Sequence, residues 1–223
     1  MPRNDYQRQL ESLREDVLDM SDLVVGRLDT ALEALDTGDE TLAERVVAGD
    51  DEINRLYLDL EGECVDLLAL QQPVATDLRF IAASFKIITD LERIADLATN
   101  LAEYAGTVAH DQTTRSELRE IGEATTEMVE TAMDAYARDD TDAAYDVAER
   151  DDAVDDYCEQ ASSRIVRDLL ESERPVDGPV ESMLDDVSTH LLTIRDLERV
   201  GDHAVNIAAR TLYMVENDDE LIY

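Results

Sequence analysis

Lysine is almost missing from this chain. Lys86 is the only lysine among 223 residues, whereas Asp and Glu together number 55 and the formal net charge is −36. A surface this acidic repels phosphate backbones and anionic lipids. This repulsion argues against nucleic-acid binding, against docking on an anionic lipid surface and against direct membrane insertion. Such an acidic excess suits molar salt, where a short screening length suppresses the repulsion between like charges. We therefore expect an acidic, halophilic-type surface.

Cysteine, proline and glycine are scarce as well. The two cysteines, Cys64 and Cys158, lie far apart and suggest neither a disulfide framework nor a thiolate zinc site. Four prolines and eight glycines are too few to punctuate a β protein. No segment approaches the roughly 18 uncharged apolar residues that a membrane span requires, and the N-terminal residues lack the apolar stretch of a signal peptide. The sequence therefore predicts a cytoplasmic protein.

Apolar residues recur at helical spacing along almost the whole chain, and a hydrophobic content of 44% is enough to bury a core. Helix-breaking and capping residues divide the pattern into six long helices. We expect these helices at 5–35, 40–71, 74–106, 115–138, 141–173 and 179–215. Long helices joined by short loops pack as antiparallel neighbours, so the predicted fold class is all-α.

The two halves of the chain repeat one another. The eleven-residue string that begins at Asp90 matches the string that begins at Asp196 at seven positions, with an offset of 106. Upstream, Asp50 corresponds to Asp151 at an offset of 101, so the five extra residues fall in the loop before the sixth helix, where an insertion costs little. An internal duplication of this kind predicts two tandem three-helix bundles. We place them at 1–108 and 109–223.

Each repeat carries a Glu-x-x-x-Asp pair, which is Glu92/Asp96 in the first and Glu198/Asp202 in the second. A spacing of four residues puts both carboxylates on one face of a helix, where they repel each other. Acidic residues are so common here that a single pair of this kind has little weight, and a plain solvated acidic stripe explains it. The recurrence of the pair in both repeats is what makes it a candidate site.

The preceding helix of each repeat carries a second polar pair, which is Asp50/Asn54 in the first repeat and Asp151/Asp155 in the second. Antiparallel packing could bring the two pairs of a repeat face to face. Three or four converging carboxylates are electrostatically costly when empty, and a multivalent cation would neutralise them. A set of oxygen ligands suits iron, manganese, magnesium or zinc with waters and does not choose between these metals.

Three further positions recur, and ordinary i,i+3 ion pairing explains them as well as a role in orienting the carboxylates does. They are Asp90/Asp196, Arg93/Arg199 and Asn100/Asn206. His203 adjoins Asp202 and could offer a nitrogen ligand, but its counterpart Leu97 cannot. We therefore do not expect a histidine ligand.

At these residues the chain resembles the PhoU family of phosphate-uptake regulators. The most specific part is the string Asp90-Leu91-Glu92-Arg93-Ile94-Ala95-Asp96 together with its repeat at 196–206, and Asp77-Leu78-Arg79 after Pro73 supports it. The resemblance covers nearly the whole chain. It implies two tandem three-helix bundles with one acidic motif in each repeat.

The resemblance also implies a function. Members of this family are cytoplasmic adaptors, often homodimers, that negatively control the Pst phosphate transporter and the associated phosphate signalling. The implied partners are the ATPase subunit of the transporter and a phosphate-sensing signalling protein. Some members carry multinuclear iron or zinc clusters. The positions that match the metal-binding pattern are Asp50, Glu92, Asp96, Asp151, Asp155, Glu198 and Asp202. Asn54 and Ala95 depart from it, which predicts a weaker or absent first-repeat site.

Three alternative functions can be compared with this one from the sequence. A di-iron oxidase would need a Glu-x-x-His motif, but Thr107, Val187 and Val200 stand three residues before the three histidines, so we expect no enzyme. A metal-free helical scaffold needs only apolar periodicity and leaves the repeated strings unexplained. An accessory protein of a different phosphate transporter is not distinguished from a Pst partner.

Overall fold

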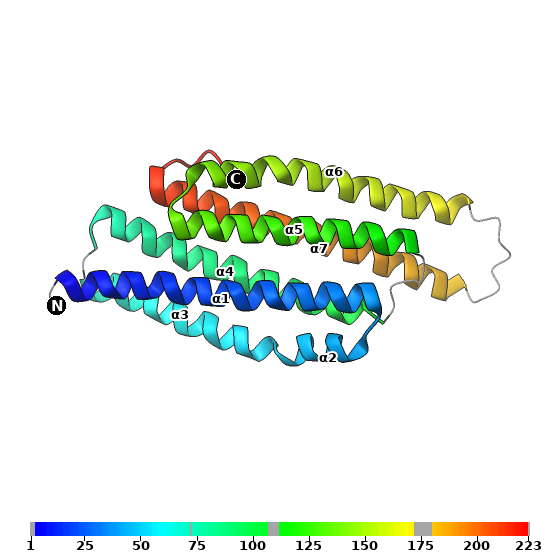
Figure 1. Ribbon diagram of the computed structural model, residues 1–223, viewed down its shortest axis with the longest axis horizontal. Helices are drawn as coiled ribbons and strands as arrows, with labels where there is room; N and C mark the ends of the chain where they lie inside the picture. Colours follow the sequence, from blue (N-terminus) through cyan, green and yellow to red (C-terminus); the bar gives the residue numbers. More distant parts are fainter. Residues whose placement is uncertain (1–2, 72, 107–111, 172–179, 223) are drawn as a thin grey trace.

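The computed structural model describes residues 3–71, 73–106, 112–171 and 180–222. Within these ranges it contains seven α-helices and no strand, which confirms the all-α fold class. The helices are α1 (Arg3–Thr37), α2 (Glu40–Ala48), α3 (Asp50–Gln71), α4 (Ala75–Tyr104), α5 (Gln112–Arg138), α6 (Thr141–Glu171) and α7 (Val180–Glu216). Figure 1 shows them lying along one long axis of an elongated molecule.

The helices form two bundles that lie side by side. The first consists of α1, α4 and the α2–α3 segment, and the second consists of α5, α6 and α7. Across the boundary between them, α4 packs on α7 and α1 packs on α5, as Figure 1 shows. The large side chains buried at the centre of this arrangement include Leu13, Leu28, Ile81, Leu91 and Tyr136. The repeats therefore share one continuous hydrophobic core.

The structure divides the helix predicted over 40–71. The division falls at Gly49, whose backbone N–H turns back to the carbonyl oxygen of Val46 at 3.1 Å. The Arg27 guanidinium of α1 lies directly beneath Gly49, because a Cβ atom added there would lie 2.7 Å from Arg27 Nη2. The absence of a side chain at Gly49 thus leaves room for the Arg27 guanidinium of another helix. At the equivalent position of the second repeat, Arg150 lies within the unbroken α6.

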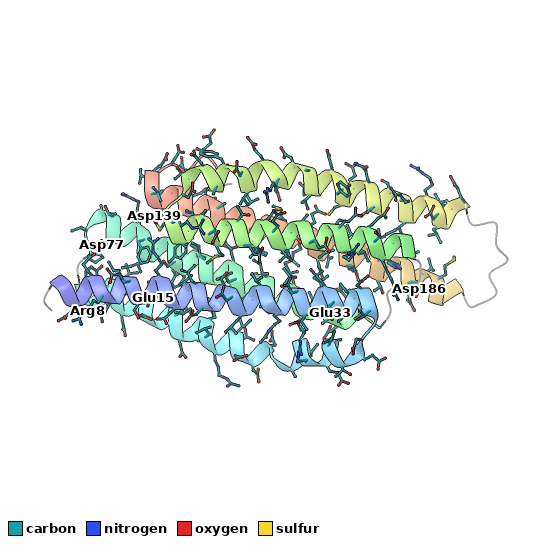
Figure 2. The ribbon with its side chains drawn as sticks, in the orientation of Figure 1. Arg8, Glu15, Glu33, Asp77, Asp139 and Asp186 are labelled. Atoms are coloured by element: carbon teal, nitrogen blue, oxygen red, sulfur yellow. The ribbon has the colours of Figure 1, made fainter. Side chains whose placement is uncertain are left out.

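The connections after α1 and α5 are built alike. Gly38 has a φ of +70° and Asp139, its equivalent at an offset of 101, has a φ of +55°. Each is followed by an aspartate that caps the next helix, since Asp39 accepts from the backbone N–H of Thr41 and Asp140 accepts from that of Ala143. Figure 2 places Asp139 at the same end of the molecule as Glu15 and Asp77.

Two equivalent arginines hold the ends of α1 and α5 together. Arg14 of α1 donates to the carbonyl oxygens of Tyr136 and Ala137 at the end of α5, at 2.8 and 3.1 Å. Its equivalent Arg115 of α5 donates to the carbonyl oxygen of Asp36 at the end of α1, at 3.0 Å. Each repeat therefore caps the last turn of the other repeat's first helix, where carbonyl oxygens lack intrahelical partners. The reciprocity follows from the duplication.

None of the helices in the described ranges is both long and apolar enough to cross a membrane. The connection predicted between the helices at 141–173 and 179–215 and the boundary placed between residues 108 and 109 both lie outside the described residues. The break predicted at 138–141 is confirmed, because α5 ends at Arg138 and α6 begins at Thr141.

Candidate metal centre

The repeated strings meet where α4 packs on α7. Asn100 of α4 donates to Asp196 of α7 at 3.3 Å, and Asn206 of α7 donates to Asp90 of α4 at the same distance. The two contacts are equivalent, since each joins the first residue of one string to the last residue of the other. The aspartate and asparagine at the ends of the strings therefore hold the two repeats together.

Further side chains complete this contact. Asp196 is fully buried and also accepts from Tyr104 at 3.1 Å and from Arg195 at 3.1 Å. On the opposite side of the contact, His203 Nδ1 lies 2.9 Å from Asp90 Oδ1. His203 is thus engaged with α4, as its half-buried position between the helices requires. A buried carboxylate needs this many donors, because burial without them would cost several kcal/mol.

The second-repeat cluster consists of Asp151 and Asp155 from α6 and Glu198 and Asp202 from α7. Burial raises the pKa of Asp151 from its ordinary value of 3.8 to about 6, and repulsion from Asp155, Asp202, Asp152 and Glu198 adds to the shift. Burial, followed by repulsion from Asp202, also raises the pKa of Asp155. The pKa of Glu198 is raised by burial and then by Asp155 and Asp202. The packing of α6 on α7 therefore brings the four predicted residues together.

Asp151 is the most deeply placed of these carboxylates. Its Oδ1 atom is buried and finds no hydrogen-bond donor among the described residues. Gly201 has no side chain, which leaves room for the Asp151 carboxylate: a Cβ atom added at Gly201 would lie only 3.2 Å from Asp151 Oδ1. An ionised oxygen that is buried without a donor is costly, and a cation would remove that cost.

The first-repeat cluster is different because other side chains donate hydrogen bonds to its carboxylates or form ion pairs with them. Asp50 accepts from Asn54 at 2.8 Å and from Thr99 at 3.5 Å. Arg93 lies 3.4 Å from Glu92 and 3.3 Å from Asp96, so one guanidinium forms ion pairs with both members of the acidic pair. Its equivalent Arg199 lies 3.7 Å from the buried Asp196 instead. The two clusters thus differ in charge balance although their sequences recur.

Electrostatics agrees with this difference. Burial and the neighbouring Asp96 raise the pKa of Glu92, while Arg93 and His203 oppose the rise and Asp50 adds to it. Side chains of the protein itself, Arg93 above all, therefore oppose the electrostatic repulsion within the first-repeat cluster. In the second-repeat cluster, every cause that shifts the pKa of Asp151 raises it.

Among the described residues, no three His, Cys, Asp or Glu side chains stand in a ready-made coordination geometry. The second-repeat carboxylates would have to draw together on an ion. The oxygen set and the donor-free Asp151 Oδ1 fit a multivalent cation. Cys158 of α6 is buried, and burial together with Glu198 and Asp155 raises the pKa of its thiol to about 12, so the thiol is protonated in the metal-free protein.

Sequence analysis missed Thr99, which donates to Asp50. Thr99 follows Glu92 and Asp96 at seven and three residues, so the same helical spacing that defined the acidic pair also places Thr99 on that face. Its equivalent in the second repeat is Val205, which has no hydrogen-bonding group. Two of the three donors to the first-repeat cluster, Asn54 and Thr99, are therefore absent from the second.

The fold and the candidate site define a class of protein: a duplicated all-helical bundle with a carboxylate pair in each repeat. A model of the PhoU domain matches this chain twice, at residues 17–105 and 118–211. The chain belongs to the PhoU family. Both matches include the acidic pair of their repeat.

Individual relatives agree with this assignment. The phosphate-specific transport system accessory protein PhoU homolog of Pseudomonas aeruginosa is 36% identical over 217 residues, which cover 96% of this chain and 86% of the relative. The Escherichia coli K12 protein PhoU, also named a phosphate-specific transport system accessory protein, is 31% identical over 216 residues, with the same coverage of both chains.

Solved structures share the fold. The crystal structure of PhoU from Pseudomonas aeruginosa superposes with a TM-score of 0.87 at 35% identity and covers 96% of this chain and 100% of its own. The phosphate transport system regulatory protein PhoU from Streptococcus pneumoniae superposes with a TM-score of 0.86 at 26% identity, covering 96% of this chain and 98% of its own.

Proposed function

We propose that this chain is a non-enzymatic accessory protein of a phosphate-specific transport system. It acts in the cytoplasm and restrains the transporter by contact with the ATPase subunit or with a phosphate-sensing signalling protein. The observation that carries this proposal is the likeness, over 96% of the chain, to proteins that bear this name. An acidic surface with a net charge of −36 suits a protein partner better than a nucleic acid.

The rigidity of the fold supports restraint by contact. Two bundles are joined by the Asp90–Asn206 and Asp196–Asn100 contacts and by the reciprocal arginine caps at Arg14 and Arg115. Such a molecule is a stiff surface that favours one conformation of a partner and shifts its equilibrium by the difference in affinity for the two states. A homodimer would present two such surfaces.

The second-repeat cluster is the proposed cation site. Asp151, Asp155, Glu198 and Asp202 would hold the ion, and iron, manganese or zinc would suit their oxygen atoms. The support is the buried Asp151 Oδ1 without a donor, beside three further carboxylates. When bound, the ion would neutralise the cluster and tie α6 to α7. In the first repeat, Arg93 and Asn54 already perform part of that task, so we expect weaker binding at Asp50, Glu92 and Asp96.

Reconstituted transport tests the proposed role. The phosphate transporter is placed in lipid vesicles, and ATP-driven phosphate uptake is measured with and without this protein in molar salt. We expect uptake to fall as the protein saturates its ATPase subunit. A matched sample unfolded by heat should have no effect. Uptake that stays constant at saturating protein would contradict the role in this transporter and favour an accessory protein of another phosphate transporter.

A further inference from the structure

A groove of about 300 Å³ lies between α5 and α6 on the second bundle. Its floor is apolar and consists of Ile121, Met128 and Val154, which are almost fully buried. The walls are low because the residues on either side are alanines, Ala124 on α5 and Ala153 on α6. An apolar hollow between two exposed helices is a place where a third helix or a bulky side chain can pack.

Comparison with the first repeat shows why the groove is open. The residues equivalent to Ala124, Met128 and Ala153 at an offset of 101 are Leu23, Arg27 and Glu52. The Arg27 side chain is only 10% exposed, and its Nη2 atom lies 3.4 Å from Glu52 Oε2. The first repeat therefore has an Arg27–Glu52 ion pair and a leucine at this position, whereas the second repeat has alanine, methionine and alanine there.

The rim carries charges and one exposed aromatic ring. Arg150 of α6 forms an ion pair with Glu127 of α5 at 3.2 Å, so the negative charge of Glu127 is offset by Arg150. Glu120 of α5 is the second acidic residue that lines the groove. Tyr157 stands at the rim with 54% of its surface exposed. Tyrosine beside an apolar hollow is typical of residues that dominate the binding energy of interfaces. Glu120 at the groove favours a partner that places a lysine or arginine in contact with it.

We propose that the groove between α5 and α6 is the docking site for an amphipathic helix of a partner protein. The helix places a bulky apolar side chain between Ala124 and Ala153, stacks against Tyr157 and presents lysine or arginine to Glu120. The inference rests on the proposed role as an adaptor, for which it supplies the contact surface. At the equivalent position of the first bundle, the Arg27–Glu52 ion pair replaces the apolar and small side chains of the groove.

The first test fills the groove without changing the net charge. The variant Ala124→Leu with Ala153→Met is compared with the parent protein and with Ala82→Met, a control at an exposed alanine of α4. The probe is a synthetic amphipathic helix with leucine on one face and lysine on the other, titrated in molar KCl. We expect the filled variant to bind it about tenfold more weakly, equivalent to about 1.4 kcal/mol. Equal binding by all three proteins would overturn the proposal.

A second variant protects the test against a folding defect. Tyr157→Ala removes only an exposed ring and should weaken probe binding several-fold. Leu170→Ala is its control, since Leu170 is exposed on the same helix outside the groove. Loss of binding in Leu170→Ala to the same extent as in Tyr157→Ala would place the probe elsewhere and refute the groove.

The purified ATPase subunit of the transporter is then titrated against the same variants. Weaker binding by the filled variant supports both the groove and the proposed role. Failure of the subunit to bind any of the proteins, while the peptide still discriminates between them, refutes that role and leaves the groove intact. A dimer in light scattering that dissociates only in the filled variant would put a second copy in the groove and overturn the proposal.

Discussion

Replacing Asp151 by asparagine should stabilise the metal-free protein at neutral pH. When an acidic group has a higher pKa in the folded protein than in the unfolded chain, the free energy of unfolding falls as the pH rises from the unfolded to the folded pKa. For Asp151 that interval runs from 3.8 to about 6, and the loss is complete above it. The Asp151→Asn variant lacks the ionisation and therefore escapes the loss.

The magnitude follows from the same values. A rise of the pKa from 3.8 to about 6 corresponds to about 3 kcal/mol if solvent does not screen the charge. Asp151 is only half-buried, so we reduce the expected gain to about 1 kcal/mol. In a chain of this size, about 1 kcal/mol raises the melting temperature by about 2–4 °C.

Thermal unfolding followed by circular dichroism measures this effect, with a chelator present and the salt concentration fixed. The Asp151→Asn variant should melt higher than the parent at pH 7.5 and at nearly the same temperature at pH 4. Asp146→Asn, at an exposed position of α6, is the matched control and should show no such dependence on pH. A variant less stable than the parent at pH 7.5 would refute the reasoning about the buried carboxylate.

Three other predictions follow from the contacts. Asp196→Ala should cost about 2–3 kcal/mol in urea unfolding, since it leaves the partly buried Asn100 and Tyr104 without an acceptor and empties a fully buried position, and Asp90→Ala should cost about 1 kcal/mol; equal costs would contradict the assigned burial. Gly201→Ala places a Cβ atom 3.2 Å from Asp151 Oδ1 and should weaken Mn²⁺ binding about tenfold, whereas Ala95→Gly should not; unchanged affinity would argue against this geometry. The melting temperature should rise between about 0.1 and 1 M KCl, as the screening length falls from about 10 to 3 Å; indifference to KCl would refute the halophilic interpretation.

The helices and the duplication could be predicted from the sequence because both depend on local patterns. Apolar periodicity marks a helix wherever it lies, and matching strings mark a repeat. The division at Gly49 could not be predicted, since an isolated glycine is tolerated inside a helix. The Arg27 guanidinium that lies beside Gly49 belongs to another helix, so no local pattern reveals the contact.

The candidate site could be predicted only in part. Spacing placed Glu198 with Asp202 and Asp151 with Asp155, and the packing of α6 on α7 brings all four together. Spacing did not reveal that Arg93 serves the acidic pair of its own repeat while Arg199 lies beside Asp196. The choice between these partners depends on which carboxylate is buried between α4 and α7, which is a property of tertiary packing.

Elemental analysis across a gel-filtration peak, with protein purified in molar salt without chelator, tests the proposed cation site most directly. The account predicts iron, manganese or zinc in stoichiometric amount. The metal should be lost from the Glu198→Gln, Asp202→Asn variant and largely retained by the Glu92→Gln, Asp96→Asn variant, with the helical spectrum of both unchanged. A folded parent that elutes without metal, or metal that follows Glu92 and Asp96, would contradict the assignment of the site to the second repeat.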